Sequence, residues 1–284
     1  MIYNNIGRIK NNIFLLSILF TSVFAISSCN KVTTQTVTTF SKLTMSDEFS
    51  TNGAPDSKLW TYDSARGPFN DGWGNNELEY YSARPSNVKV ENGNLEITAR
   101  QENYMGAQYT SARILTRGKF EQAYGRYEAR IKIPSGQGMW PAFWLLGANC
   151  AIGNGPGTVW PQCGEIDIME NRGQQPTQIQ GTVHGLGYSG GNSITKSYFL
   201  PTGRFDNDFH VFGIEWGPEY INFYVDDQLY NQITPAKVTG PWLFDHPFYI
   251  ILNLAVGGGF VGPPNASTVF PQTMYVDYVR VYEK

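Results

Sequence analysis

The sequence has little charge and few side chains of the kind that ligate metals. Charged residues make up 16% of the 284 residues, the net charge is −3, and no cluster of basic residues occurs. Proteins that bind nucleic acids use basic clusters to neutralise phosphates, so we expect no nucleic-acid partner. The chain has three histidines and three cysteines, and no histidine has ligand spacing to a cysteine pair. This argues against a zinc site.

Helical periodicity is missing from every long segment, whereas strand patterns are frequent. Residues 124–134 alternate apolar and polar side chains, as a half-buried strand does, and residues 275–282 repeat the pattern. Residues 221–230 resemble two strands joined by a tight turn at Asp226 and Asp227. Many short strands separated by turn residues, in a chain with 30 glycines, predict an all-β sandwich or barrel.

One long apolar run lies at the N-terminus. Residues 13–26 follow Arg8 and Lys10, are too short for a comfortable membrane span, and have the layout of a secretory signal. The run ends in small residues and Cys29, which resemble a bacterial lipobox, where the cysteine becomes the lipid-modified first residue of the mature protein. An ordinary signal peptide cleaved nearby, with Cys29 incidental, is the alternative.

These patterns divide the chain into three parts. We expect a lipoprotein signal peptide at residues 1–28, a polar, threonine-rich and flexible tether at 29–42, and one folded domain at 43–284. A domain of this length suits one large all-β architecture, and no linker is visible inside it.

Two cysteines fall in the folded domain and flank a glycine-rich segment. In an oxidising compartment, Cys150 and Cys163 could close this segment as a disulfide-bonded loop. Two free buried thiols are the alternative, and the sequence alone leaves both open.

The tryptophans lie beside glycine, proline or loop-like sequence more often than a core requires. A buried core position is the default interpretation for any one of them. Several on turns suggest a groove lined by flat apolar faces, on which sugar rings stack while neighbouring polar side chains bind the hydroxyls. The residues concerned are Trp73, Trp140, Trp144, Trp160 and Trp242.

Three carboxylates are concentrated in residues 164–171, GEIDIMEN. In a regular strand Glu165 and Asp167 share one face, and Glu170 points to the other. A β-bulge at or near Met169 would reset the alternation and place all three on one face. The alternative is a strand with an acidic solvent face, in which Glu170 pairs with a basic residue elsewhere.

Carboxyl pairs of this kind cleave glycosidic bonds with retention. One carboxylate attacks the anomeric carbon and a protonated carboxyl group about 5–5.5 Å away protonates the leaving oxygen. An acid placed between the two, such as Asp167, would orient the nucleophile and help the second acid to stay protonated.

Residues 164–171 resemble the active-site signature of glycoside hydrolase family 16, in the form with the extra residue found in laminarinase-like members. The resemblance implies a concanavalin A-like β-jelly-roll sandwich with a concave glycan-binding cleft, and makes residues 43–284 the catalytic domain. It continues along the chain in DEF (47–49), GWGNNELEYY (72–81), ENGNLEIT (91–98), YGRYEARIKIP (124–134), MWPAFWLLG (139–147), GTVHG (181–185), FHVFGIEWGPEYINFYVD (209–226), PFYIILNLAVGG (247–258) and MYVDYVRVY (274–282).

The resemblance also implies roles for individual residues. Glu165 would be the nucleophile, Asp167 its helper and Glu170 the general acid/base. His184 would lie near Glu170 on the adjacent strand and tune it, whereas without the resemblance a satisfied core histidine is the ordinary interpretation. Substrate-binding residues are expected at Trp140, Trp144, Asn75, Arg113, Trp160 and Trp242.

The implied function is that of a retaining endo-β-1,3-glucanase acting on laminarin-like glucans. Alternatives are a relative acting on mixed-linkage β-1,3-1,4-glucan or a marine galactan, a transglycosylase, and a non-catalytic glycan-binding lipoprotein. The lack of a basic cluster near the aromatic loops favours a neutral glucan over a sulfated one. The binding-protein alternative would need the catalytic carboxylates to be lost, and all three are present.

No catalytic cofactor is expected. Family members often carry a structural calcium on the convex side, and the matching positions are Glu48, Gly93 and Asp277. We expect a monomer held at a membrane by a lipid anchor on Cys29, exported to the bacterial cell envelope at the outer membrane, facing the periplasm or the outside.

Overall fold

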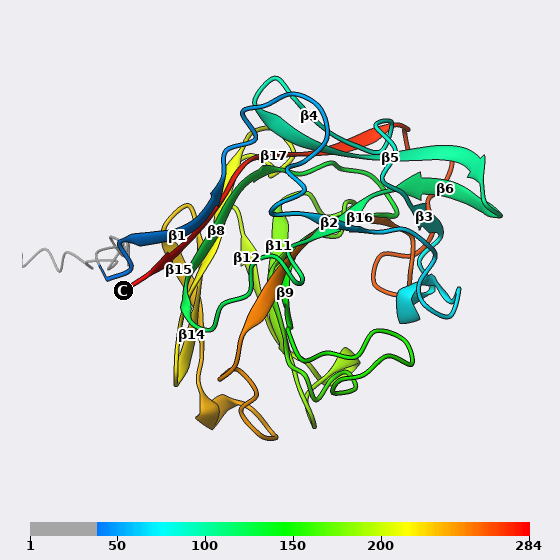
Figure 1. The fold of residues 1–284 in the computed structure, drawn as a ribbon. Helices are drawn as coiled ribbons and strands as arrows, with labels where there is room; N and C mark the ends of the chain where they lie inside the picture. The colour runs from blue at the N-terminus through cyan, green and yellow to red at the C-terminus, as the bar shows by residue number, and fades with distance from the viewer. Residues whose placement is uncertain (1–38) are drawn as a thin grey trace, which may run out of the picture. The chain divides into compact units, whose positions relative to one another are not determined.

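Two β-sheets stack face to face in the computed structural model, which describes residues 39–284 (Figure 1). The expected signal peptide, the lipid anchor at Cys29 and most of the tether lie outside these residues. Among residues 39–284, no helix has the length and apolar character needed to cross a membrane. The predicted all-β jelly-roll sandwich is confirmed.

The larger sheet has ten strands, nearly all antiparallel to their neighbours; β3 and β6 are a parallel pair. Along its main path the order is β15 (Gln228–Ile233), β14 (Tyr220–Val225), β13 (His210–Gly217), β8 (Gly125–Lys132), β17 (Gln272–Glu283), β5 (Asn94–Tyr104), β6 (Ala107–Ser111) and β3 (Glu79–Tyr81). Two further strands extend it, with β1 (Lys42–Asp47) on β17 and β4 (Val88–Glu91) on β5.

The smaller sheet has seven strands and carries the candidate site. Its order is β12 (Ile194–Phe199), β11 (Gln178–His184), β10 (Glu165–Glu170), β9 (Met139–Gly147), β16 (Phe248–Val256), β7 (Arg113–Leu115) and β2 (Thr61–Asp63). Short helical turns lie in the connections, at η1 (Gly72–Asn76), η2 (Gly190–Asn192) and η3 (Pro235–Lys237).

The sequence patterns form the expected elements. The alternating segment 124–134 becomes β8, and its apolar residues Tyr127, Ala129 and Ile131 are fully buried. Asp226 and Asp227 join β14 to β15 with φ values of 48° and 61°, so this is the primed turn that the twist of two antiparallel strands favours.

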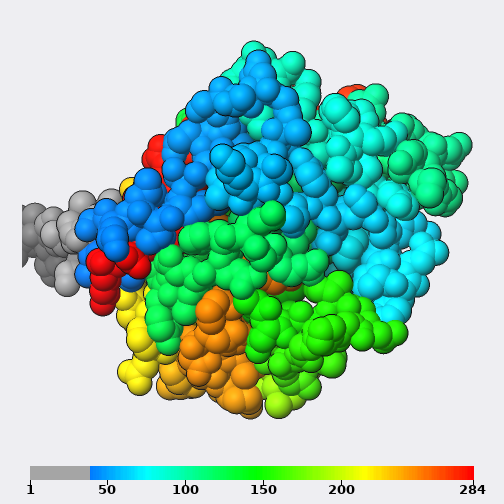
Figure 2. Space-filling model, viewed as in Figure 1, coloured from blue at the N-terminus to red at the C-terminus, as the bar shows by residue number. Residues whose placement is uncertain are grey.

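The described N-terminal end and the C-terminal strand lie side by side. Strand β1 pairs with β17 from Lys42, opposite Glu283, to Asp47, and the blue and red segments meet at the surface in Figure 2. Phe40 is 5% exposed. The expected boundary between tether and domain after residue 42 is therefore too late, because residues 40–42 already pack and pair with the sheet.

The main hydrophobic core lies between the sheets. Alternate residues of each strand point into it, and bulky side chains such as Trp216, Phe143 and Phe212 are fully buried there. Burial of apolar area on this scale is the main force that holds two sheets together. The outer face of the seven-stranded sheet is consequently free to carry polar groups.

Candidate active site

A cleft of about 950 Å³ runs over the outer face of the seven-stranded sheet. Strands β7, β9, β10, β11 and β16 form its floor, and segments 68–77 and 150–160 contribute to its walls. A cleft of this volume with both aromatic and charged walls is typical of a ligand-binding site.

Strand β10 brings three acids to this cleft. Ile166 and Ile168 point into the core, whereas Glu165, Asp167 and Glu170 line the cleft. The register with β9 pairs Asp167 with Trp144 and then Met169 with Phe143, so it skips Ile168. The predicted bulge at or near Met169 is confirmed, and Glu170 lies on the same face as the other two acids because of it.

His184 faces the acids from β11, directly opposite Glu165 in the strand register. Its Nε2 lies 3.2 Å from Asp167 Oδ2 and 3.6 Å from Glu165 Oε1. The backbone N–H of Gly190 donates to Nδ1 over 3.2 Å, which directs the imidazole proton on Nε2 toward the carboxylates. As expected, His184 lies on the strand adjacent to Glu170 and its charge lowers the pKa of Glu170, although the direct register partner of Glu170 is Gln180.

Each outer acid of the trio receives one indole hydrogen bond. Trp160 Nε1 donates to Glu165 Oε2 over 3.0 Å, and Trp140 Nε1 donates to Glu170 Oε1 over 3.0 Å. An N–H donor stabilises the ionised carboxylate and fixes the side-chain orientation. Both tryptophans were expected in the cleft, and both line it.

Burial is the main influence on the two glutamates. It raises the pKa of Glu165 to about 7, with help from Asp167 and against His184, the Trp160 indole and Arg113. It raises the pKa of Glu170 to about 8, and the negative charges of Asp167 and Glu165 add to the effect. Glu165 has His184 Nε2 within 3.6 Å as well as its indole donor, so Glu165 is the acid whose ionised form has the closer support.

The imidazole of His184 responds to the same charges. Burial lowers its pKa, but the hydrogen bond with Asp167 and the charges of Glu165, Asp167 and Glu170 outweigh burial and raise the pKa to about 9. With its Nε2 directed at the carboxylates, the imidazole offsets part of the negative charge collected in the cleft.

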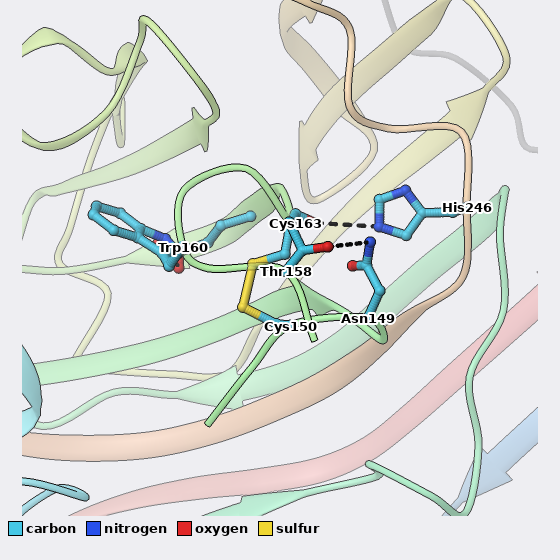
Figure 3. Close-up of a disulfide and its surroundings, with 7 residues drawn as sticks. Asn149, Cys150, Thr158, Trp160, Cys163 and His246 are labelled. Carbon is cyan, nitrogen blue, oxygen red and sulfur yellow. Dashed lines mark hydrogen bonds between the residues drawn. A yellow bond between two sulfur atoms is a disulfide. The ribbon is translucent and has the colours of Figure 1, made fainter. Parts of the chain in front are cut away.

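One wall of the cleft is a loop between β9 and β10 that a disulfide closes (Figure 3). Cys150 and Cys163 are paired, as one of the two sequence alternatives anticipated. The disulfide belongs to a small apolar cluster that includes Leu146 and Tyr249, so the loop is held against the sheet by packing as well. Trp160 lies in this loop and owes its position over Glu165 to it.

Polar contacts hold the base of the same loop. Asn149 Nδ2 donates to Thr158 Oγ1 over 3.5 Å, and His246 Nε2 lies 3.2 Å from the carbonyl oxygen of Cys163 (Figure 3). Gly164, with φ of 74°, then turns the chain into β10. A Cβ there would lie 2.9 Å from the Phe248 ring, so glycine is required by both its conformation and its surroundings.

Three further predicted substrate-binding residues also line the cleft, namely Asn75, Arg113 and Trp144. The Arg113 guanidinium stacks between the rings of Trp73 and Trp144, at 4.6 and 4.8 Å from their centroids, and pairs with Asp63 at 3.0 Å. This stacking leaves Arg113 8% exposed and firmly oriented.

The placement of Trp242 in the cleft is wrong. Trp242 is not among the described residues that line the cleft, and its ring packs edge-on against Phe244 at 4.8 Å, beside the main core. The neighbouring glycine and proline suggested an exposed turn, but the flanking apolar residues draw the indole inward.

The expected calcium ligands do not form a carboxylate site. Glu48 makes two hydrogen bonds to Arg280, at 2.9 and 2.8 Å, and Asp277 pairs with Arg130 at 2.7 Å. These arginines already neutralise both carboxylates, and Gly93 has no side-chain donor. Among residues 39–284, the group of side chains that could hold a metal ion is instead Glu165, Asp167 and His184.

The sequence analysis missed several cleft residues. Glu77 is 4% exposed and Asn253 6%, yet both line the cleft. Trp73, expected in an aromatic groove, lines it too. Asn253 is the single strongly polar residue in the apolar strand β16, and that isolation was an available signal. Glu77 lies in GWGNNELEYY, the segment that also holds the predicted residues Trp73 and Asn75.

Two carboxyl groups of unequal proton affinity on one side of a glycan-sized cleft can perform a double displacement at an acetal carbon. The comparisons with known proteins agree with this chemistry. Residues 75–280 match the family Glycosyl hydrolases family 16, and the chain belongs to this family.

Several of the similar proteins of known name are glucanases. The chain is 45% identical over 251 residues to a beta-glucanase of Rhodothermus marinus, covering 85% of both chains. It is 48% identical to the laminarinase catalytic domain of Thermotoga maritima, with a TM-score of 0.79 and coverage of 86% of this chain and 98% of that one. An endo-beta-1,3-glucanase of Pyrococcus furiosus is also 48% identical, with a TM-score of 0.79 and coverage of 85% and 94%.

Each indole hydrogen bond should influence a different limb of the pH profile of kcat/KM. Trp160→Phe removes a donor that lowers the pKa of Glu165, so that pKa rises. Because Glu165 must be ionised to attack, the acidic limb of kcat/KM should move to higher pH. Trp140→Phe raises the pKa of Glu170 in the same way, and because Glu170 must be protonated, the alkaline limb should move to higher pH.

The measurement is kcat/KM on a soluble β-glucan across the pH range. Trp242→Phe is the matched control, because this indole lies outside the cleft, and it should leave both limbs in place. A Trp160→Phe profile with an unmoved acidic limb would contradict the assignment of Glu165.

Proposed function

We propose that the protein is a retaining endo-β-1,3-glucanase that hydrolyses laminarin-like β-glucans through a covalent glycosyl-enzyme intermediate. The observation that carries the proposal is the placement of Glu165 and Glu170 on one cleft face by the β10 bulge. Burial raises the pKa of both acids, and the charge of Glu165 adds to the rise at Glu170. The similarity to a laminarinase and to a protein named an endo-beta-1,3-glucanase supports this substrate.

In the first step Glu165 attacks the anomeric carbon and Glu170 protonates the leaving oxygen. Glu170 Oε1 accepts the Trp140 hydrogen bond, so Oε2 is the oxygen left to carry the proton. Trp160 and His184 hold the Glu165 carboxylate from two sides and keep it oriented for attack.

In the second step Glu170 takes a proton from water, which then releases the sugar from Glu165. The negative charge of Glu165 is one of the causes of the raised pKa of Glu170. Ester formation removes this charge, so the pKa of Glu170 falls at the stage when it has to act as a base.

The chemistry needs no cofactor, because side-chain carboxyl groups supply both the nucleophile and the proton. The indole faces of Trp140 and Trp144 offer stacking surfaces for glucose rings, and Asn75 and Arg113 lie among them as polar partners for hydroxyl groups. Asp167, 4% exposed and in contact with His184, is assigned to positioning Glu165.

Replacement of the nucleophile gives the first test. Glu165→Ala should lower kcat for laminarin by roughly ten-thousandfold or more, because no covalent intermediate can form, while oligosaccharide binding persists. Reducing-end release measures turnover, and calorimetric titration with laminari-oligosaccharides measures binding. Glu219→Gln, an exposed carboxylate on the far turn between β13 and β14, is the control. Turnover close to the wild-type rate in Glu165→Ala would refute the mechanism.

A substrate panel tests the linkage. Laminarin should be hydrolysed faster than barley glucan, lichenan and agarose. Preferred cleavage of lichenan or agarose would assign the protein to another activity of the same family, and binding of laminarin without product would assign it to glycan binding.

We further propose a structural calcium ion near Glu48, Gly93 and Asp277 on the ten-stranded sheet. β17 pairs with both β1 and β5 here, and its register with β8 is irregular between Val276 and Tyr278. Main-chain carbonyl groups are good calcium ligands and would not compete with the arginines that hold Glu48 and Asp277. Calcium should raise the melting temperature by several degrees and chelator should reverse this, with no change in kcat. A melting temperature that changes neither with calcium nor with chelator would refute the proposed calcium site.

We also propose that the chain is a monomeric lipoprotein of the bacterial cell envelope, with a signal at residues 1–28 and an anchor on Cys29. The support is the sequence alone, since these residues lie outside the described part. Expressed in a bacterium with lipoprotein processing, the protein should fractionate with membranes, and Cys29→Ser should release it to the soluble fraction. Equal membrane association of both forms would refute the anchor.

A further inference from the structure

Two glutamates, Glu77 and Glu79, are buried against each other beneath the cleft. Glu77 is 4% exposed and borders the cleft, whereas Glu79, two residues further on, is fully buried. Two ionised carboxylates at such a site would repel each other and lose their hydration, so one of them must carry a proton.

Hydrogen bonds identify which glutamate is protonated. Glu77 accepts hydrogen bonds on both oxygens, from Asn75 Nδ2 at 2.9 Å and from the Tyr81 hydroxyl at 3.0 Å. Glu79 Oε2 accepts the backbone N–H of Val256 at 2.6 Å, but Glu79 Oε1 is buried with no donor among the described residues. A buried oxygen without a donor is satisfied if it is itself a hydroxyl that donates.

The electrostatic surroundings agree with this assignment. Burial raises the pKa of Glu79 well above its usual range, and the charge of Glu77 and a hydrogen bond to it add to the rise. Arg113 lies close enough to Glu77 for their charges to interact.

Glu77 is also the end point of a directed hydrogen-bond chain across the cleft floor. Trp144 Nε1 donates to Asn253 Oδ1 at 2.7 Å, and Asn253 Nδ2 donates to the Tyr81 hydroxyl at 3.0 Å. The Tyr81 hydroxyl then donates to Glu77. Each donor points toward Glu77, so an ionised acceptor at this end fixes the direction of every bond in the chain.

The hydrogen-bond chain that ends at Glu77 reaches the surface of the cleft at several points. Asn75, Glu77, Trp144 and Asn253 all line the cleft, and the Trp144 ring stacks on Arg113. Within residues 39–284, the side-chain hydrogen bonds to Glu165 and Glu170 come from Trp160 and Trp140. The hydrogen-bond chain that ends at Glu77 is therefore a separate network.

We propose that Glu77 is a positioning residue for glucan binding, ionised and paired with a neutral Glu79, and that this carboxyl–carboxylate pair orients the Asn75, Asn253 and Trp144 side chains that meet the sugar. The proposal rests on the glucanase function above and adds residues to which that function assigned no role.

Replacing each acid by its amide should raise KM to different extents. In Glu77→Gln one of the two acceptor oxygens is lost, so KM for laminarin should rise about tenfold with kcat within about twofold. In Glu79→Gln the amide N–H still donates to Glu77, so the rise in KM should be at least several times smaller. Glu219→Gln is the control for carboxylate exchange at an exposed turn.

An infrared measurement reports protonation without any substrate. The absorption of buried neutral carboxyl groups at neutral pH should lose one component in Glu79→Gln and keep that component in Glu77→Gln, while the contribution of Glu170 remains in both variants. Should Glu77→Gln fail to fold, as judged by circular dichroism, Tyr81→Phe tests the same chain, because it removes the donor to Glu77, and it should also raise KM.

The reverse order of effects, with Glu79→Gln the more damaging variant, would overturn the proposal, and so would neutral-carboxyl absorption that Glu79→Gln leaves undiminished. A wild-type protein without activity on laminarin would instead refute the proposed function, and would leave the infrared result standing as a separate test of the pair.

Discussion

A strand places successive side chains on opposite faces, and the active site depends on one departure from that rule. The register of β10 with β9 skips Ile168, which turns Glu170 back to the face of Glu165 and Asp167. The core on the opposite side keeps Ile166, Ile168 and Met169 buried, so the bulge costs no exposed apolar area. The stacked sheets supply the rigid support against which a bulge of this kind can be held.

Collecting acids on one face creates an electrostatic problem that the neighbouring strands and loops solve. An unpaired buried carboxylate costs about 1–3 kcal/mol or more, and each acid has a designated partner: Trp160 for Glu165, Trp140 for Glu170 and His184 for Asp167. The partners differ in number and charge, and so the two glutamates differ in proton affinity. The same principle operates beneath the floor, where a proton on one acid takes the place of a basic partner for the other.

The local part of this site could be predicted from sequence. The spacing of Glu165 and Glu170 required a bulge, and the alternating segments required stacked sheets. The predictions that failed concern residues whose contacts are distant in sequence. Trp242 packs on the core, and Glu48 binds Arg280, 232 residues away. Glu77 was overlooked because its significance arises from Tyr81 and Asn253, which no pattern in residues 72–81 could connect to it.

The geometry of the cleft depends in part on the loop that the Cys150–Cys163 disulfide closes. Most of the binding surface consists of strands that folding alone assembles, but the wall that carries Trp160 is completed by a covalent bond between Cys150 and Cys163. The orientation of the attacking carboxylate is thus linked to an oxidation reaction, and the finished site is a product of maturation as well as of folding. A chain that reaches its fold in a reducing environment has all the catalytic residues, yet lacks one of the constraints that align them.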